Sequence, residues 1–230
     1  MDGAVSRIEF TPKFALFLFF ALAINAAYFW LAIDPVDVSV SLDESGAIET
    51  VQLVYLASGA ALFFAAAAML SKADRMLCIG VSVLGLVFFL RELEIDKTGP
   101  ISTYLQSKSF RAHEALLVAG VAVVYLVLRW RLVSDVVRYV FSKTAWPFYI
   151  AGVLLLAGAL FDMLHGSVSN QIKEEIFECS SYLSLVLVAG MVCYQQPGAI
   201  LRRKSADFLM VVVTVCLFAG ACWLTELVNR

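Results

Sequence analysis

The sequence has few charged residues, few histidines and no paired cysteines. Only 16% of its 230 residues are Asp, Glu, Lys or Arg, whereas an average soluble domain has about 25%. It has only two histidines, and its five cysteines are scattered without a CxxC spacing. A zinc-ribbon or dithiol redox motif is therefore excluded. With so few charged residues and the apolar excess described below, we expect neither a soluble enzyme nor a nucleic-acid partner. A disordered regulator is excluded as well, because such chains are rich in charge and poor in apolar residues.

Apolar residues dominate the chain instead. They make up 61% of it, and the mean hydropathy is +0.85. A single soluble core cannot bury this much apolar surface, so the solvent for most of the chain must be the lipid bilayer. The apolar runs show no strand-like alternation, and isolated strands cannot span lipid. We therefore predict an all-α polytopic transmembrane helix bundle that forms a single domain over residues 1–230.

Seven apolar runs approach the length of about 20 residues that crosses a bilayer. The spans are expected near residues 14–33, 48–70, 76–95, 113–130, 146–165, 175–195 and 207–226. The first also resembles a signal peptide, because Arg7 and Lys13 precede a short apolar stretch that ends in small residues. The aromatic residues that follow, Tyr28, Phe29 and Trp30, instead favour a retained span. Both interpretations place the N-terminus inside.

Lysine and arginine are unevenly divided between the two sides that these spans define. With the N-terminus inside, about 11 of the 17 basic residues fall in inner segments. The acids are distributed the other way, with about 5 of the 19 inside. Because the side richer in Lys and Arg stays cytoplasmic, we predict an inner N-terminus and an outer C-terminus in a bacterial cytoplasmic (inner) membrane.

The segment Arg131–Lys143, on the inner side, has the pattern of a helix that lies on the membrane surface. Leu132, Val136, Tyr139 and Val140 are spaced to share one helix face, and basic residues lie between them. Such a helix suits an anionic inner leaflet.

The third apolar run is too short to cross a bilayer by itself. Residues 76–90 form about 22 Å of helix. Because Ser71–Arg75 is polar, we expect the helix to extend outward to about Ile95. The extension would place Arg91, Glu92 and Glu94 at the outer boundary of the hydrocarbon, where a charge costs free energy.

Other ionisable residues fall at the same outer level of neighbouring spans. Asp162 and His165 are three residues apart at the end of the fifth span and share a face. Further polar residues open the second, fourth and sixth spans or close the seventh: Glu49, Gln52, His113, Glu114, Glu174, Glu175, Glu178 and Glu226. Both histidines of the chain and most of its membrane-depth carboxylates therefore belong to one leaflet.

Carboxylates and imidazoles in one leaflet suit a cation site. We expect the ligands of a divalent metal to come from Glu92, Glu94, His113, Asp162, His165, Glu175 and Glu178, with Arg91 as the counter-charge. Mg²⁺ or Mn²⁺ would fit if oxygen ligands dominate, and Zn²⁺ or Fe²⁺ if the histidines take part. With an open coordination position, such a metal would activate water to hydrolyse a lipid-like substrate, and Asp162, His165 and Glu178 would be catalytic. Without a metal, the carboxylates would bind or relay protons.

The helix dipole offers a purely structural explanation for some of these acids, because negative charge is favoured at a helix N-terminus. It covers the acids that open spans: Glu49, Glu114, Glu174 and Glu175. It does not cover those near C-termini, where the dipole disfavours them: Glu92, Glu94, Asp162 and Glu226. These four require a function or a specific ion pair.

Several classes of helical membrane protein are excluded by missing residues. The last apolar run has no lysine to hold retinal, no GxSG serine motif occurs, and two histidines are fewer than the three that membrane hydrolases of the ceramidase type use for zinc. We predict a membrane protein with an outer-leaflet Glu/Asp/His pocket for a cation or proton, which would act as a metal-assisted hydrolase. The alternatives are an accessory subunit that packs against other membrane subunits through small residues such as Gly158 and Gly190, and an ion-coupled transporter. The apolar middles of the helices favour a one-sided site over a transport path.

Overall fold

The computed structural model describes residues 8–32, 47–92, 104, 107–164 and 168–195. The expected seventh span, Glu94 and His165 lie outside these residues. All secondary structure in the described ranges is helical. The helices are α1 (Pro12–Ala32), α3 (Ala47–Met69), α4 (Lys72–Glu92), α6 (Lys108–Leu128), α7 (Trp130–Val140), the 3₁₀ turn η1 (Lys143–Ala145), α8 (Trp146–Met163) and α9 (Val168–Tyr194).

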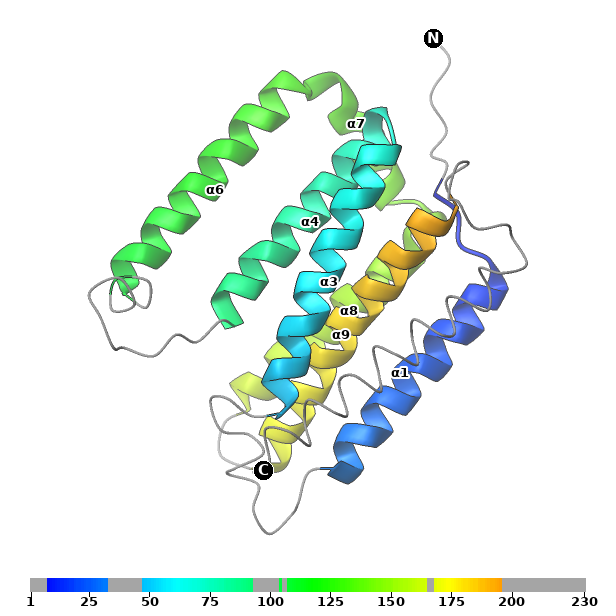
Figure 1. Ribbon diagram of the computed structural model, residues 1–230, viewed down its shortest axis with the longest axis vertical. Helices are drawn as coiled ribbons and strands as arrows, with labels where there is room; N and C mark the ends of the chain where they lie inside the picture. Colours follow the sequence, from blue (N-terminus) through cyan, green and yellow to red (C-terminus); the bar gives the residue numbers. More distant parts are fainter. Residues whose placement is uncertain (1–7, 33–46, 93–103, 105–106, 165–167, 196–230) are drawn as a thin grey trace.

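The described helices have the length and composition of a membrane bundle. Five of them, α1, α3, α4, α8 and α9, are long and apolar enough to cross a bilayer, and a sixth span is formed if α6 and α7 count as one broken span. Successive long helices run in opposite directions, so that their ends meet at two opposite ends of the bundle (Figure 1). In the part of the chain that the structure describes, the prediction of an all-helical fold is thus confirmed, and five or six of its helices are long and apolar enough to cross a membrane. The count of seven spans stays a prediction.

Helix α9 forms the centre of the bundle. It packs against α1, α3 and α8, and α3 in turn packs against α4. Within its most apolar stretch 67% of the residues are buried, compared with 22% for α1 and for α8. The remaining surface of α1 and α8 carries large apolar side chains that face outward, as Phe20 and Leu160 do. These surfaces suit contact with lipid.

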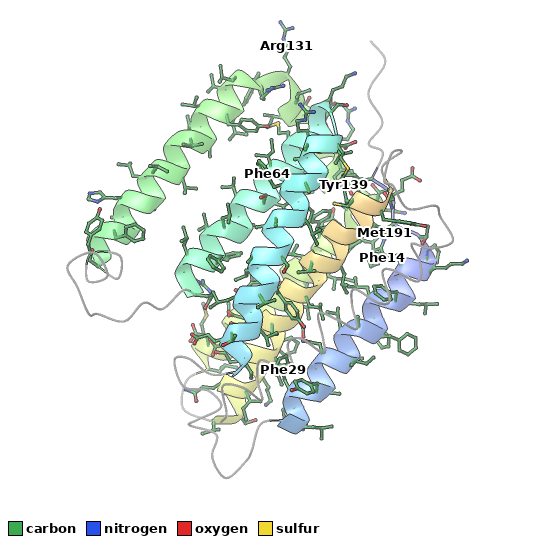
Figure 2. All side chains as sticks on the ribbon, viewed as in Figure 1. Phe14, Phe29, Phe64, Arg131, Tyr139 and Met191 are labelled. Carbon is green, nitrogen blue, oxygen red and sulfur yellow. The ribbon has the colours of Figure 1, made fainter. Side chains whose placement is uncertain are left out.

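One face of α1 attaches it to α9. This face is formed by four buried residues that lie one or two helical turns apart: Phe14, Leu18, Asn25 and Phe29. Phe14 and Phe29, near the two ends of the helix, lie on its side toward α9 (Figure 2). At the centre, Asn25 Nδ2 donates a hydrogen bond to Ser180 Oγ at 3.1 Å. These contacts hold α1 against α9, and its retention in the protein stays a prediction.

The turn between α3 and α4 changes the interpretation of the third span. The helix begins at Lys72, not near Met76. It therefore includes most of the polar segment Ser71–Arg75, which was expected to precede the span. Its 21 residues give about 32 Å of helix. The expected extension to Ile95 lies outside the described residues. Arg75 makes the polar start tolerable, because its Nε donates to the carbonyl oxygens of Ala67 (3.0 Å) and Leu70 (2.8 Å) at the end of α3.

Helices α6 and α7 meet at an angle of 103°. The segment predicted as a surface helix is helical as α7, and its inward face includes Leu132, Val136 and the buried Tyr139. Its position on a membrane surface stays a prediction. Val140 does not share that face as expected, since its exposure is 36%. Arg131, just after the bend, points away from the bundle (Figure 2). Helix α7 packs against α4, whereas the described contacts of α6 are mainly with α7.

We expect Asn25→Leu to weaken the attachment of α1 to α9. The substitution removes the donor to Ser180 from a fully buried position, and interhelical hydrogen bonds in membranes contribute about 1 kcal/mol. Unfolding of the purified protein in detergent–SDS mixtures should show this loss of stability. Ile24→Ala is the control, because Ile24 is 55% exposed on the lipid side and its truncation should change little. Equal stability of Asn25→Leu and the unaltered protein would contradict this prediction.

Candidate functional site

The residues of the candidate site that the structure describes lie largely at one end of the bundle. This is the end where α4 and α8 finish and α3 and α9 begin (Figure 1). Glu92 is the last residue of α4, Asp162 is in the last turn of α8, and Glu175 and Glu178 are in the second and third turns of α9. We call the group formed by Arg91, Glu92, Asp162, Glu175 and Glu178 the acidic end cluster.

The α4 part of the cluster is an ion pair that contacts two aromatic residues, Phe88 and Tyr182. Arg91 Nη2 donates to Glu92 Oε1 at 2.6 Å, and the guanidinium lies 5.5 Å from the centre of the Phe88 ring. Tyr182 of α9 donates its hydroxyl to the same Glu92 oxygen at 3.4 Å. The side chain of Arg91 is 53% exposed whereas that of Glu92 is 16% exposed. The carboxylate is therefore enclosed while its cationic partner stays partly accessible.

The α3 part of the cluster is a buried amide that holds a carboxylate. Gln52 is 1% exposed, and its Nε2 donates to Glu175 Oε2 at 2.7 Å and to the Glu175 backbone oxygen at 3.4 Å. An amide in this place is expensive to bury unless it is hydrogen-bonded. The bond therefore fixes the rotation of α9 relative to α3 and directs the Glu175 carboxylate toward the interior of the bundle end.

Glu178 connects the α4, α8 and α9 parts of the cluster. Its side chain packs over Gly158 of α8. The principal charges acting on it are those of Glu92, Arg91, Glu174 and Asp162. Three acids and one cation thus surround a carboxylate that is itself half-buried. Such an arrangement leaves an excess of negative charge in a poorly hydrated place, where electrostatic interactions are strong.

The structure removes the helix dipole as an explanation for Glu174 and Glu175. They were expected to open a span near residue 175, but α9 begins at Val168, about two turns earlier. Dipole stabilisation is confined to the first turn of a helix, so it does not reach these residues. Similarly, α6 begins at Lys108 with Ser107 as its N-cap, whose Oγ accepts from Phe110 N at 3.1 Å. His113 is therefore in the second turn of that helix and does not open it.

Neither histidine is found in the acidic end cluster among the residues that the structure describes. His113 lies on α6, whose contacts are mainly with α7, and its Nδ1 pairs with the Tyr104 hydroxyl at 2.8 Å. His165 was expected in the last turn of the fifth span, but α8 ends at Met163 and His165 is outside the described residues. Within those residues, no three His, Cys, Asp or Glu side chains are placed to hold one metal ion. The full metal set, which includes Glu94 and His165, stays a prediction.

The structure also adds polar residues that the sequence did not point out. Tyr182 is one turn beyond Glu178 on α9, so its spacing could have revealed it, but tyrosine is also common at membrane interfaces. Deeper in the bundle, the Tyr55 hydroxyl donates to Asn25 Oδ1 at 3.4 Å, and Asn25 donates to Ser180. Since Tyr55 is one turn beyond Gln52 on α3, polar groups continue from the cluster toward the middle of the bundle. The helix interiors are thus less purely apolar than expected.

We predict a strong coupling between Gln52 and Glu175. Gln52→Met or Glu175→Met alone should destabilise the protein by about 1–3 kcal/mol, because each leaves a buried polar partner unsatisfied. The double variant should lose less than the sum, since replacing both partners by apolar groups can be nearly neutral. Unfolding in detergent–SDS mixtures measures all three variants, and strictly additive losses would show that the hydrogen bond contributes nothing.

Comparison with protein families, with curated proteins and with solved structures finds no match to this chain. Its function must therefore be inferred from the residues of the cluster themselves.

Proposed function

We propose that this chain is an integral membrane protein that binds a cation or a proton in the acidic end cluster. The observation that carries the proposal is the convergence of Glu92, Glu175 and Glu178 from two helices, with Arg91 as the charge that opposes them. Glu92 is far from the other two in the sequence, and a bundle that needed only solvated anchors would not bring it beside them. A bound cation or proton would offset the excess negative charge.

The neighbouring residues support reversible binding. Gln52 and Tyr182 hold Glu175 and Glu92 by hydrogen bonds, so both carboxylates are positioned without a ligand. Arg91 can move away from Glu92 more easily than the acids can move, because its side chain is the more exposed of the pair. An incoming cation would therefore compete with the guanidinium of Arg91 for the Glu92 carboxylate.

Metal-assisted hydrolysis of a lipid-like substrate is a more specific form of the same proposal. It requires the residues outside the described ranges, His165 and Glu94, to complete a ligand set with Asp162 and Glu178. The chemistry of these donors fits Mg²⁺ or Mn²⁺ if oxygen atoms dominate, and Zn²⁺ or Fe²⁺ if His165 takes part.

Transport is a second candidate function, and a specific observation favours it. The buried polar groups of Gln52, Tyr55, Asn25 and Ser180 extend from the cluster to the middle of the bundle. Polar residues at such depth often mark an ion or proton path. If the protein is instead an accessory subunit of a larger membrane complex, its function should not depend on the cluster. The experiment below separates this role from cation binding and from transport.

The proposed place of the protein is a bacterial cytoplasmic membrane, with the N-terminus inside and the acidic end cluster on the outer side. It rests on the excess of Lys and Arg in the segments at the opposite end, of which Arg75, Arg131 and Arg138 are examples.

The proposed function is tested by binding measurements on the full chain in lipid nanodiscs. Electron paramagnetic resonance measures Mn²⁺ binding, and the infrared bands of carboxyl groups measure proton binding as the pH is changed. Glu178→Gln should weaken Mn²⁺ binding about tenfold or more, since it removes a charge from the site. Arg91→Gln should strengthen it, because the competing cation is lost.

Glu9→Gln is the matched control, since it makes the same change beside Gln195 at the opposite end of the bundle. If Glu178→Gln alters neither Mn²⁺ binding nor the pH-dependent carboxyl signal, the cluster is not a binding site and the accessory role is favoured. Loading of Mn²⁺ or protons into sealed liposomes, measured in parallel, separates transport from binding alone.

The orientation is tested by fusing alkaline phosphatase at each end of the bundle. The enzyme is active only outside the cytoplasm, so a fusion after Ser71 should be inactive and a fusion after Leu164 should be active. The reverse pattern would place the acidic end cluster in the cytoplasm.

A further inference from the structure

Gly158 lies where α8 passes closest to the carboxylate-bearing part of α9. A Cβ atom added at this residue would be 2.8 Å from Glu178 Cγ, 3.3 Å from the Glu174 carbonyl oxygen and 3.6 Å from Glu178 N. A separation of 2.8 Å is closer than carbon atoms can pack. Cγ is near the root of the side chain, so Glu178 cannot avoid the clash by moving its carboxylate alone. Either the side chain must adopt another rotamer or the two helices must separate.

The close approach is specific to this position on α8. Two turns earlier on the same face, Ala151 also lies against α9, and its carbonyl oxygen accepts a hydrogen bond from Ser181 at 2.8 Å. An alanine Cβ is therefore accommodated at that contact. Gly152, next to it, has no atom within 4 Å of an added Cβ and is exposed. Of the two glycines, Gly158 is thus the one whose neighbours leave no room for a side chain.

We propose that Gly158 is a positioning residue of the acidic end cluster, whose missing side chain lets Glu178 lie against α8 among Glu92, Arg91 and Asp162. The proposal rests on the function proposed above, because it gives Gly158 a role through the cation or proton that Glu178 binds. Helix packing alone would also favour a glycine here, because the Glu174 carbonyl oxygen is 3.3 Å from the added Cβ. The closest atom, however, is Glu178 Cγ at 2.8 Å, so the side chain of Glu178 is the first group that an alanine would displace.

The test compares Gly158→Ala with Gly152→Ala in the full chain in lipid nanodiscs. The probes are Mn²⁺, followed by electron paramagnetic resonance, and protons, followed by the carboxyl infrared bands. Gly158→Ala should weaken Mn²⁺ binding about tenfold, the size expected when the support of a ligating group is lost, or change the pH dependence of the carboxyl signal. Gly152→Ala should leave both unchanged. In a Glu178→Gln background, Gly158→Ala should have no further effect on binding.

Two outcomes would overturn the proposal. One is a Gly158→Ala variant that binds Mn²⁺ and protons as Gly152→Ala does, while Glu178→Gln alters binding. The other is an undiminished effect of Gly158→Ala in the Glu178→Gln background. If Glu178→Gln itself has no effect, the proposed function has failed and Gly158 loses this role with it.

A second pair of variants covers a failure to fold. If Gly158→Ala does not give a monodisperse protein, Gly158→Ala/Glu178→Ala should restore it, because the Cγ atom that clashes is then absent. If the double variant remains misfolded, the obstacle is the backbone of α9, and Gly158 serves helix packing and not the position of Glu178.

Discussion

The absence of water inside the bilayer is the constraint on which the rest of this structure depends. Apolar contacts between helices gain little over contacts with lipid, so close packing and polar contacts must specify the arrangement. Helix α9 supplies many of both, with Ala189 and Val192 packed at its core and with Ser180, Ser181 and Glu175 bonded to α1, α8 and α3. Each of these bonds sets the rotation of one helix about α9.

The same constraint makes the acidic end cluster informative. Elsewhere in the described bundle the buried polar groups are mostly neutral and bond to a neighbouring helix, as Ser82 does to the Ala60 carbonyl oxygen at 2.8 Å. At the end where α4 finishes, ionisable groups replace them, and several acids act on one another across three helices. Structural bonding is achieved elsewhere with serine and asparagine. Of the carboxylates in the cluster, Glu175 makes such a structural bond, with Gln52, whereas Glu92 and Glu178 are the ones on which the functional proposal chiefly depends.

The class of the protein could be predicted from the sequence because the apolar runs are a property of each segment alone. The spans found for α1, α3 and α8 differ from those expected by a few residues. The start of α4 was predicted too late because Arg75 bonds to carbonyl groups of α3, and a single segment carries no sign of such a partner. The early start of α9 was missed for a related reason, because residues 168–174 are mostly polar and their helical state was not apparent from hydropathy.

The candidate site was predictable only in part. The level of Glu92, Asp162, Glu175 and Glu178 follows from their positions along the spans, but whether they meet depends on helix rotation. That rotation is set by contacts such as Gln52 with Glu175 and Gly158 with Glu178, which join residues more than 100 or about 20 positions apart. His113 shows the other outcome, since it has the right depth but belongs to a helix that packs elsewhere.

The bend between α6 and α7 has a mechanical consequence. Helix α7 is held by α4, but α6 is attached to the described bundle mainly through α7. A helix held by neighbours on several sides has its tilt set by packing, whereas one held at a single joint adjusts its tilt to the thickness of the hydrocarbon. In the described part of the chain, α1, α3 and α8 are held by α9 and α4 is held by α3, so α6 is the long helix whose tilt is least fixed by packing.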